Sequence, residues 1–289
     1  MSSSGASSAD PALMRSKTVL VTGSTDGVGR QTAVDLAGLG AMVIVHGRDP
    51  GRGAAAFAAV QGAARAAGST REPVLCLADL SSLQGVHALV AEVRRHCERL
   101  DALVNNAGVY APRRVITPDG FELTFAVNVV APFLLTRELL PLLDAAARAR
   151  IVNLSSTSHW TGEMHWDDLQ LERFYDPLVA YEQSKLAMTL FTFALARRLE
   201  GSGVTAVCLD PGNVATGMLR AGWPELVGID LVAGAATSVA LTSSLEAEGL
   251  SGVYYENGRR TAPPGVSLDH GAQVRLWTVL ERMADGDVW

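Results

Sequence analysis

The residues best suited to chemistry are a tyrosine and a lysine four positions apart, Tyr181 and Lys185, within a stretch of helical spacing. Side chains four apart on a helix lie on one face, so the two groups would be neighbours. A free tyrosine has a pKa of about 10 and is a poor general base near neutrality. A nearby ammonium favours the phenolate, so we expect the pKa of Tyr181 to move towards the working pH and the pair to transfer protons. Taken alone, such a pair is more often an ordinary surface pattern.

A second candidate is the glycine-rich stretch Gly23-x-x-x-Gly27-x-Gly29. It follows a short β-branched apolar run at residues 19–21 and precedes helical spacing at residues 31–39. A strand, a tight turn and a helix N-terminus together bind phosphate through free N–H groups and the helix dipole. For three glycines alone, a surface turn is the alternative, but the position at a strand-to-helix junction favours an anion site.

The composition is that of an ordinary globular enzyme, with 48% hydrophobic and 19% charged residues among 289. The net charge of −6 argues against nucleic acid or an anionic membrane as the main partner. We find neither a long unbroken apolar span nor a signal peptide, and expect a cytoplasmic protein. Residues 1–15 are predicted to be a disordered tail and residues 16–289 a single dinucleotide-binding catalytic domain. The cysteines, at unrelated spacings in apolar segments, predict buried thiols and no metal site: Cys76, Cys97 and Cys208.

Strand-like and helix-like segments alternate along the chain. After the first strand, further strands are predicted at residues 42–45, 73–77, 102–104, 151–154, 204–209 and 252–255. Between them, helices are predicted at residues 54–67, 83–99, 121–147 and 180–200, and residues 157–178 read as irregular. This order predicts an α/β protein with a Rossmann-like, doubly wound parallel sheet of about seven strands and helices on both faces.

In such a sheet, ligands bind beyond the carboxyl ends of the strands. The unusual residues of this chain follow the predicted strands one after another: the glycine turn, Arg48, Asp79-Leu80, Asn105-Asn106-Ala107-Gly108, Ser155-Ser156 and Pro211-Gly212-Asn213. We therefore expect one site along this edge.

Several motifs occur together and in a fixed order: Thr22-Gly23-x-x-x-Gly27-x-Gly29, Asp79-Leu80, Asn105-Asn106-Ala107-Gly108, Asn128, Ser156, Tyr181-x-x-x-Lys185 and Pro211-Gly212-x-Val214-x-Thr216. Through them the chain resembles a short-chain dehydrogenase/reductase over residues 17–216. The wide gap from Ser156 to Tyr181 and the tail motifs at residues 251–255 and 275–277 are similar to the retinol-dehydrogenase and WW-domain-oxidoreductase branch. We expect only that branch's catalytic domain, without its membrane anchor or WW modules.

The resemblance implies a catalytic set of Asn128, Ser156, Tyr181 and Lys185. Ser156 would hydrogen-bond the substrate oxygen, Lys185 would also bind the ribose, and Asn128 would hold a water in a proton relay. Adjacent strand residues point to opposite faces, so only one of Ser155 and Ser156 can face the site, and the family's register selects Ser156.

The resemblance also implies a dinucleotide site. Its residues are Gly23, Thr25, Asp26, Gly27, Val28, Gly29, Arg48, Asp79, Leu80, Asn106, Ala107, Gly108, Tyr181, Lys185, Pro211, Gly212, Val214 and Thr216. Asp79 has an ordinary turn as its alternative role, and Thr216 a helix cap. Asn105 is expected to satisfy backbone groups, while Asn106 lets the cofactor approach.

The choice of cofactor is read at the end of the second strand, where His46, Gly47 and Arg48 stand in place of a carboxylate. A guanidinium suits a ribose 2′-phosphate, so we favour NADP, with NADPH preferred over NADH. Asp49 and Asp26 oppose this choice, because Asp49 is close enough to accept from a ribose hydroxyl and Asp26 lies where a basic residue would favour NADP.

Two segments, residues 159–178 and 217–229, are expected to line the substrate pocket. Their large side chains favour a bulky apolar or aromatic carbonyl compound or alcohol, although packing of the loops explains them equally well: His159, Trp160, Met164, Trp166, Phe174, Met218, Leu219, Trp223 and Leu226.

The leading hypothesis is an oxidoreductase that transfers hydride between nicotinamide and a carbonyl or secondary alcohol. The alternatives are a tailoring enzyme of the same fold that performs an elimination, cyclisation or epimerisation, and a non-catalytic NADP(H)-sensing regulator. Apolar residues surround most of the predicted helices at 121–147 and 180–200, which predicts a homodimer or homotetramer through them. The rival explanation is that other parts of the same chain cover these faces.

Overall fold

A single sheet of eight strands, in the order β3-β2-β1-β4-β5-β6-β7-β8, forms the centre of the computed structural model, which describes residues 14–287. Seven strands are parallel, and their apolar β-branched sequences are typical of strands buried on both faces: β1 (Thr18–Val21), β2 (Met42–Gly47), β3 (Val74–Leu77), β4 (Ala102–Asn105), β5 (Ala149–Leu154), β6 (Val204–Asp210) and β7 (Val253–Glu256). The predicted parallel sheet is thus confirmed.

An eighth strand, β8 (Arg259–Thr261), pairs antiparallel with β7 and was not predicted. The two strands are joined by Asn257 and Gly258, which both have positive φ, 50° and 73°. A two-residue Asn-Gly loop in this conformation is the preferred connection of a tight hairpin.

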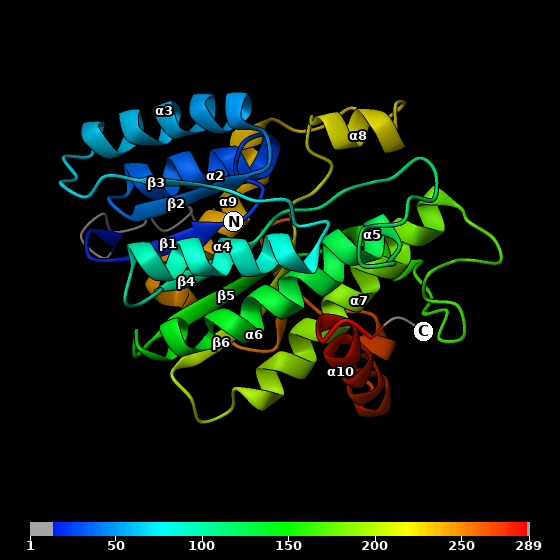
Figure 1. Cartoon of the computed structure of the whole chain (residues 1–289). Helices are drawn as coiled ribbons and strands as arrows, with labels where there is room; N and C mark the ends of the chain where they lie inside the picture. Colours follow the sequence, from blue (N-terminus) through cyan, green and yellow to red (C-terminus); the bar gives the residue numbers. More distant parts are fainter. Residues whose placement is uncertain (1–13, 288–289) are drawn as a thin grey trace, which may run out of the picture.

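Helices cover both faces of the sheet, as predicted (Figure 1). One layer holds α2 (Gly27–Gly38), α3 (Pro50–Ala66) and α9 (Leu231–Ser243). The other holds α4 (Leu83–His96), α6 (Ala131–Asp144) and α7 (Pro177–Arg198), and α10 (His270–Ala284) packs on α6 and α7. A buried apolar cluster fills the space under each layer and shields the central strands from water on both faces.

The helix predicted at residues 121–147 is interrupted. Its first turn, α5 (Leu123–Phe125), is capped by the buried carboxylate of Glu122, which accepts from the N–H groups of Thr124 and Phe125 at 2.8 Å each. A π-helical segment, η1 (Ala126–Val130), follows and carries Asn128 before α6 begins. Such π segments recur at functional sites because they re-aim a side chain within a helix.

Helix α10 covers the apolar faces of α6 and α7. The ring of Trp277 lies 5.1 Å from that of Phe133 and 6.0 Å from that of Phe191, and the Arg198 guanidinium lies 3.8 Å from the Trp277 ring centroid. The dimer was predicted because a second copy of the chain would cover the outer face of α7. In the structure, α10 of the same chain covers that face. The basis for that dimer is removed, and the oligomeric state stays a prediction.

Two smaller expectations also change. Of the tail predicted at residues 1–15, residues 1–13 lie outside the described part, but Met14 is buried against the α2 layer. Cys76 and Cys208 are buried as expected, whereas Cys97 is only half-buried.

The stretch Leu123–Asp144 is long and apolar enough to cross a membrane, but 72% of its most apolar window is buried inside the protein, as in a core helix.

We predict that Trp277→Ala lowers the free energy of unfolding by about 3 kcal/mol, because it removes the aromatic and cation–π contacts that fasten α10 to α6 and α7. Urea denaturation measures this change. The control is Trp160→Ala, because that side chain is 49% exposed and its loss should cost less than about 1 kcal/mol. An equal loss in both variants would show that α10 is not held through Trp277.

Candidate active site

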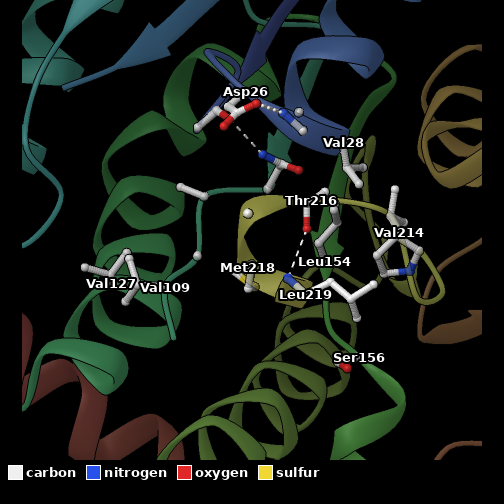
Figure 2. Close-up of a pocket in the computed structure, with 18 of the residues that line it drawn as sticks. Asp26, Val28, Val109, Val127, Leu154, Ser156, Val214, Thr216, Met218 and Leu219 are labelled. Atoms are coloured by element: carbon white, nitrogen blue, oxygen red, sulfur yellow. Dashed lines mark hydrogen bonds between the residues drawn. The ribbon is translucent and has the colours of Figure 1, made fainter. Parts of the chain in front are cut away.

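A cavity of about 670 Å³ runs along the carboxyl ends of the strands. All the residues predicted to bind the dinucleotide line it, and so does Ser156. Figure 2 shows Asp26 and Val28 at one end, Ser156 at the other, and Thr216, Met218 and Leu219 between them. The cavity thus connects the glycine turn with the Tyr181 region in one continuous space.

The glycine turn leaves no room for side chains. Gly23 has φ of 62°, and a Cβ atom there would lie 2.8 Å from the Cα atom of Ala107. A Cβ atom on Gly29 would overlap the side-chain amide of Asn106. Only glycine lets these backbones approach so closely, and the N-terminus of α2 is thereby left open to an anion.

Asn106 lines the cavity as expected, and it also takes the backbone role that was expected of Asn105. Nδ2 of Asn106 donates to the carbonyl oxygens of Thr22 (2.8 Å) and Gly23 (3.2 Å), so Asn106 satisfies the backbone of the turn. Asn105 instead donates from Nδ2 to Oδ1 of Asn153 at 2.8 Å in the buried interior. Both side chains stabilise this edge of the sheet through hydrogen bonds. The sequence alone does not show which of the two adjacent asparagines bonds to the glycine turn.

His46, which the sequence analysis used only to read the end of β2, holds the glycine turn. Its Nδ1 accepts from the N–H of Gly23 at 3.1 Å, so Nε2 carries the proton and donates to the carbonyl of Ala78 at 3.2 Å. Burial lowers the pKa of His46 to about 4. Protonation of Nδ1 would remove the acceptor of the Gly23 N–H and place a charge in the interior.

The catalytic candidates Tyr181 and Lys185 lie on one face of α7. Burial, and not the interaction between the two groups, has the largest effect on the pKa of each. Burial raises the pKa of Tyr181 above its usual value, and a hydrogen bond with Ser156 opposes this shift. The Lys185 Nζ atom lies 5.4 Å from the Tyr181 ring centroid and donates to the carbonyl of Leu154 at 3.0 Å. Burial also lowers the pKa of Lys185 to about 8. The expected lowering of the Tyr181 pKa is therefore wrong for this arrangement, and the tyrosine is held as a proton donor.

The two adjacent serines separate as strand geometry requires. The Ser155 hydroxyl is buried and donates to the carbonyl of Lys185 at 2.9 Å, which ties β5 to α7. The Ser156 hydroxyl faces the cavity and accepts from the N–H of Ser158 at 3.2 Å.

Asn128 does not line the cavity but lies directly behind it. Its Oδ1 accepts from the N–H of Val109 at 2.8 Å, and its Nδ2 donates to the Val109 carbonyl and to the Ser184 hydroxyl. A Cβ atom built on Gly108 would meet Asn128 Oδ1 at 3.4 Å and Lys185 Nζ at 3.7 Å, so these two groups face the same glycine.

The predicted substrate segments fare differently. The second is confirmed as lining, since Met218, Leu219, Trp223 and Leu226 all contribute to the cavity wall. The first is wrong, because none of its five side chains lines the cavity: His159, Trp160, Met164, Trp166 and Phe174.

The first segment fails because its side chains are committed elsewhere. His159 is fully buried, with Nδ1 2.9 Å from the Thr189 hydroxyl and its ring 4.5 Å from that of Tyr254. The Trp166 ring packs under the Arg275 guanidinium at 4.6 Å, and Phe174 is 74% exposed.

Sequence reasoning missed Arg52 and Asp210, which also line the cavity. The Asp210 carboxylate accepts from the N–H groups of Thr157 (3.1 Å) and Gly212 (2.9 Å), which joins the turns after β5 and β6. Burial raises its pKa. The signal for Asp210 was a charged residue at the end of a buried strand. The signal for Arg52 was the proline after Asp49, because a proline there marks the start of a helix and places Arg52 in its first turn.

The acidic residues near the glycine turn and β2 mostly cap helices. Asp49 accepts from the N–H of Arg52 at 2.7 Å and is not part of the cavity wall. Asp26 accepts from the N–H of Gly27 at 2.8 Å while lining the cavity. Thr216 likewise both caps α8 (Gly217–Gly222) and lines the cavity.

Comparison with known proteins decides the family. The model of the family described as short chain dehydrogenase matches residues 17–226. This chain belongs to the short-chain dehydrogenase family. It is therefore an oxidoreductase that acts on CH–OH donors, in a family that uses NAD or NADP.

Among the relatives of this short-chain dehydrogenase, Retinol dehydrogenase 14 from Homo sapiens is 39% identical, covering 95% of this chain and 88% of the relative. Polyprenol dehydrogenase from Mus musculus is 37% identical, covering 94% and 87%. An uncharacterized protein from Mycobacterium Paratuberculosis has a solved structure with a TM-score of 0.77 and 30% identity, covering 94% of both chains. The resemblance to the retinol-dehydrogenase branch is thereby confirmed.

We predict that this short-chain dehydrogenase loses stability in acid through its buried histidines. The folded-state pKa of His46 is about 4 against 6.5 for a free histidine, so the unfolded chain binds a proton that the native chain excludes. The stabilisation is complete above pH 6.5 and is lost as the pH falls towards 4, by about 3 kcal/mol per such histidine. His159 has a similarly lowered pKa.

Urea denaturation across this pH range checks the prediction. His46→Gln should flatten the pH dependence of the free energy of unfolding, while His270→Gln, at an exposed position, is the matched control. An unchanged slope in His46→Gln would contradict the assignment of a neutral, buried His46.

Proposed function

We propose that this chain transfers hydride between NADP(H) and the carbonyl or secondary alcohol of a bulky apolar substrate. The observation that carries the proposal is that one cavity joins a glycine-lined anion site to the Ser156–Tyr181 pair. A dinucleotide has its reactive ring at one end, its pyrophosphate in the middle and its adenosine at the other end, and this cavity offers the pyrophosphate and the ring matching environments along its length.

The residues present fit a dinucleotide. The cramped backbone at Gly23 and Gly29 and the open N-terminus of α2 would hold its phosphates, and Lys185 would donate to a ribose. When bound, the nicotinamide supplies or accepts the hydride.

The preference for NADP rests on two guanidinium groups. Arg48 and Arg52 both line the cavity beside Gly47, at the start of α3, and neither forms an ion pair within residues 14–287. Asp49, the competing ribose acceptor, is occupied in capping α3. Two cations suit a 2′-phosphate, whereas Asp26, which also lines the cavity, opposes it.

In carbonyl reduction, the protonated Tyr181 would donate its proton to the substrate oxygen while Ser156 hydrogen-bonds the same atom. The burial that raises the Tyr181 pKa keeps that proton in place until the oxygen becomes negative. Lys185, held by the Leu154 carbonyl, would stabilise the tyrosinate that results. Asn128 would keep the segment at residues 108–109 in place behind this group.

The substrate class is inferred from the apolar side chains of the cavity lining, which include Val109, Val127, Met218, Leu219 and Trp223. They favour an apolar body next to the reacting carbon. The names of the relatives, retinol and polyprenol dehydrogenases, point to long isoprenoid alcohols and aldehydes of the same character.

Of the two alternatives, the site argues against the non-catalytic sensor. Ser156, Tyr181, Lys185 and Asn128 lie close together, which a sensor without turnover would not need, while a tailoring enzyme of the same fold would use the same groups.

We predict that Tyr181→Phe lowers kcat by a factor of about 10²–10⁴, because it removes the proton donor and leaves the packing nearly unchanged. Binding of NADPH, followed by fluorescence, should stay within a few-fold of wild type. Turnover of an apolar aldehyde measured at 340 nm checks the first part. Activity within a few-fold of wild type would rule out this role for Tyr181.

Arg48→Ala and Arg52→Ala are each expected to weaken NADPH binding roughly ten- to hundredfold and to leave NADH binding nearly unchanged, because only NADPH carries the 2′-phosphate. Arg65→Ala is the matched control, since Arg65 lies on the same helix outside the cavity. Titrations at fixed ionic strength are needed, since salt screens this contact. Equal weakening of both dinucleotides would make the arginines structural.

A further inference from the structure

The short helix α8 and the residue after it lie across the catalytic tyrosine. The Tyr181 hydroxyl donates to the Sδ atom of Met218 at 3.6 Å. The ring of Trp223 lies 5.3 Å from the rings of both Tyr181 and Tyr110, and the Tyr110 and Tyr181 rings are 5.9 Å apart. Met218, Trp223 and Tyr110 thus form an apolar cap, which we call the α8 cap.

The α8 cap is fitted closely to the rest of the site. Thr216 accepts from the N–H of Leu219 and fixes the start of α8, and a Cβ atom on Gly222 would lie 3.4 Å from the Tyr110 ring. Figure 2 shows Met218 and Leu219 between the Asp26 end of the cavity and Ser156. The cap therefore lies beside both the cofactor region and the reacting groups.

The Met218 sulfur accepts the Tyr181 proton that the proposed reduction would give to the substrate oxygen. A tyrosine hydroxyl carries one proton and donates it to one acceptor at a time. While Tyr181 donates to Met218, it cannot donate to a carbonyl. The Met218 side chain must leave before the proposed proton transfer, and its three rotatable bonds make that movement easy.

Moving the cap breaks aromatic contacts of Trp223 as well as the hydrogen bond to Met218. A bulky apolar substrate replaces those contacts with its own surface against Val109, Val127 and Leu219. A small polar carbonyl compound has no such surface and leaves the displaced rings in water.

We infer that Met218, Trp223 and Tyr110 are specificity-determining residues. They cover Tyr181, and a bulky apolar substrate displaces them whereas a small carbonyl compound does not. This inference rests on the proposed function for its kinetic consequences. The geometry of the cap stands independently of turnover.

The kinetic test compares geranial, a long apolar aldehyde, with propanal, with NADPH as the reductant. Met218→Ala should raise kcat/KM for propanal about tenfold and leave that for geranial unchanged or lower. Met218→Leu keeps the volume but not the sulfur acceptor, so it should give a smaller gain of the same sign. Trp223→Ala removes aromatic contacts that entry must break, so it should also raise kcat/KM for propanal and leave that for geranial unchanged or lower, whereas Trp160→Ala, a tryptophan outside the cavity, should change neither substrate.

A second measurement does not need catalysis. The chain has five tryptophans, so 5-fluorotryptophan labelling gives a small set of ¹⁹F resonances, and Trp223→Phe assigns the one from the cap. With NADP⁺ present, so that no aldehyde is reduced, geranial should shift the Trp223 resonance and propanal at the same concentration should not.

Two results would overturn the inference: a Trp223 resonance unmoved by saturating geranial, or Met218 and Trp223 variants that change both aldehydes by the same factor. A geranial-dependent shift without turnover would instead refute the proposed function while supporting the cap.

Discussion

The attachment of α7 to β5 is the constraint on which the rest of the site depends. Two of its hydrogen bonds lie at the site: the Ser155 hydroxyl to the Lys185 carbonyl at 2.9 Å, and the Lys185 ammonium to the Leu154 carbonyl at 3.0 Å. They tie consecutive residues of the strand to one turn of the helix. Ser156, the next residue, must then face the same cavity as Tyr181.

The same attachment is extended by buried side chains. Thr189, one turn after Lys185, lies 3.0 Å from the Ser155 hydroxyl and 2.9 Å from Nδ1 of His159. His159 belongs to the short turn η2 (Thr157–Trp160) that leaves β5. The segment on either side of Ser156 is therefore anchored to α7, and a small error in the packing of that helix would move the reacting groups apart.

Burial determines the protonation of these groups. It raises the pKa of Tyr181 and Asp210 and lowers that of Lys185 to about 8. All three shifts favour the neutral forms because burial of these groups at the cavity wall disfavours their charged forms. A neutral tyrosine in such a region is a donor for an oxygen that becomes negative, which is the requirement of carbonyl reduction.

Local patterns made part of the molecule predictable from sequence. The glycine turn, Ser156 and the Tyr181–Lys185 spacing lie within or beside elements whose geometry fixes where they point. The parallel sheet followed from alternation alone. Two further features have sequence signals: the Asn257-Gly258 pair predicts a hairpin, and the amphipathic pattern of α10 predicts a helix that packs on other helices. A helix at α10 removes the argument for a dimer, because it covers α6 and α7.

Other features depended on contacts between distant segments. His159 and Trp166 were assigned to the cavity because of their type, but a buried threonine and an arginine on α10 hold them elsewhere. The π segment around Asn128 has no sequence signal in helical periodicity. The backbone role expected of Asn105 falls to Asn106, because the packed backbone decides which amide meets the glycine turn.

The measurement that tests the central claim most directly is the transfer of deuterium from NADPH deuterated at C4 of the nicotinamide to an apolar aldehyde such as geranial. The account predicts that mass spectrometry finds one deuterium on the carbinol carbon of the product alcohol, and none with Tyr181→Phe on the same timescale. Binding of NADPH without any deuterium in the alcohol, across apolar aldehydes of different length, would contradict it.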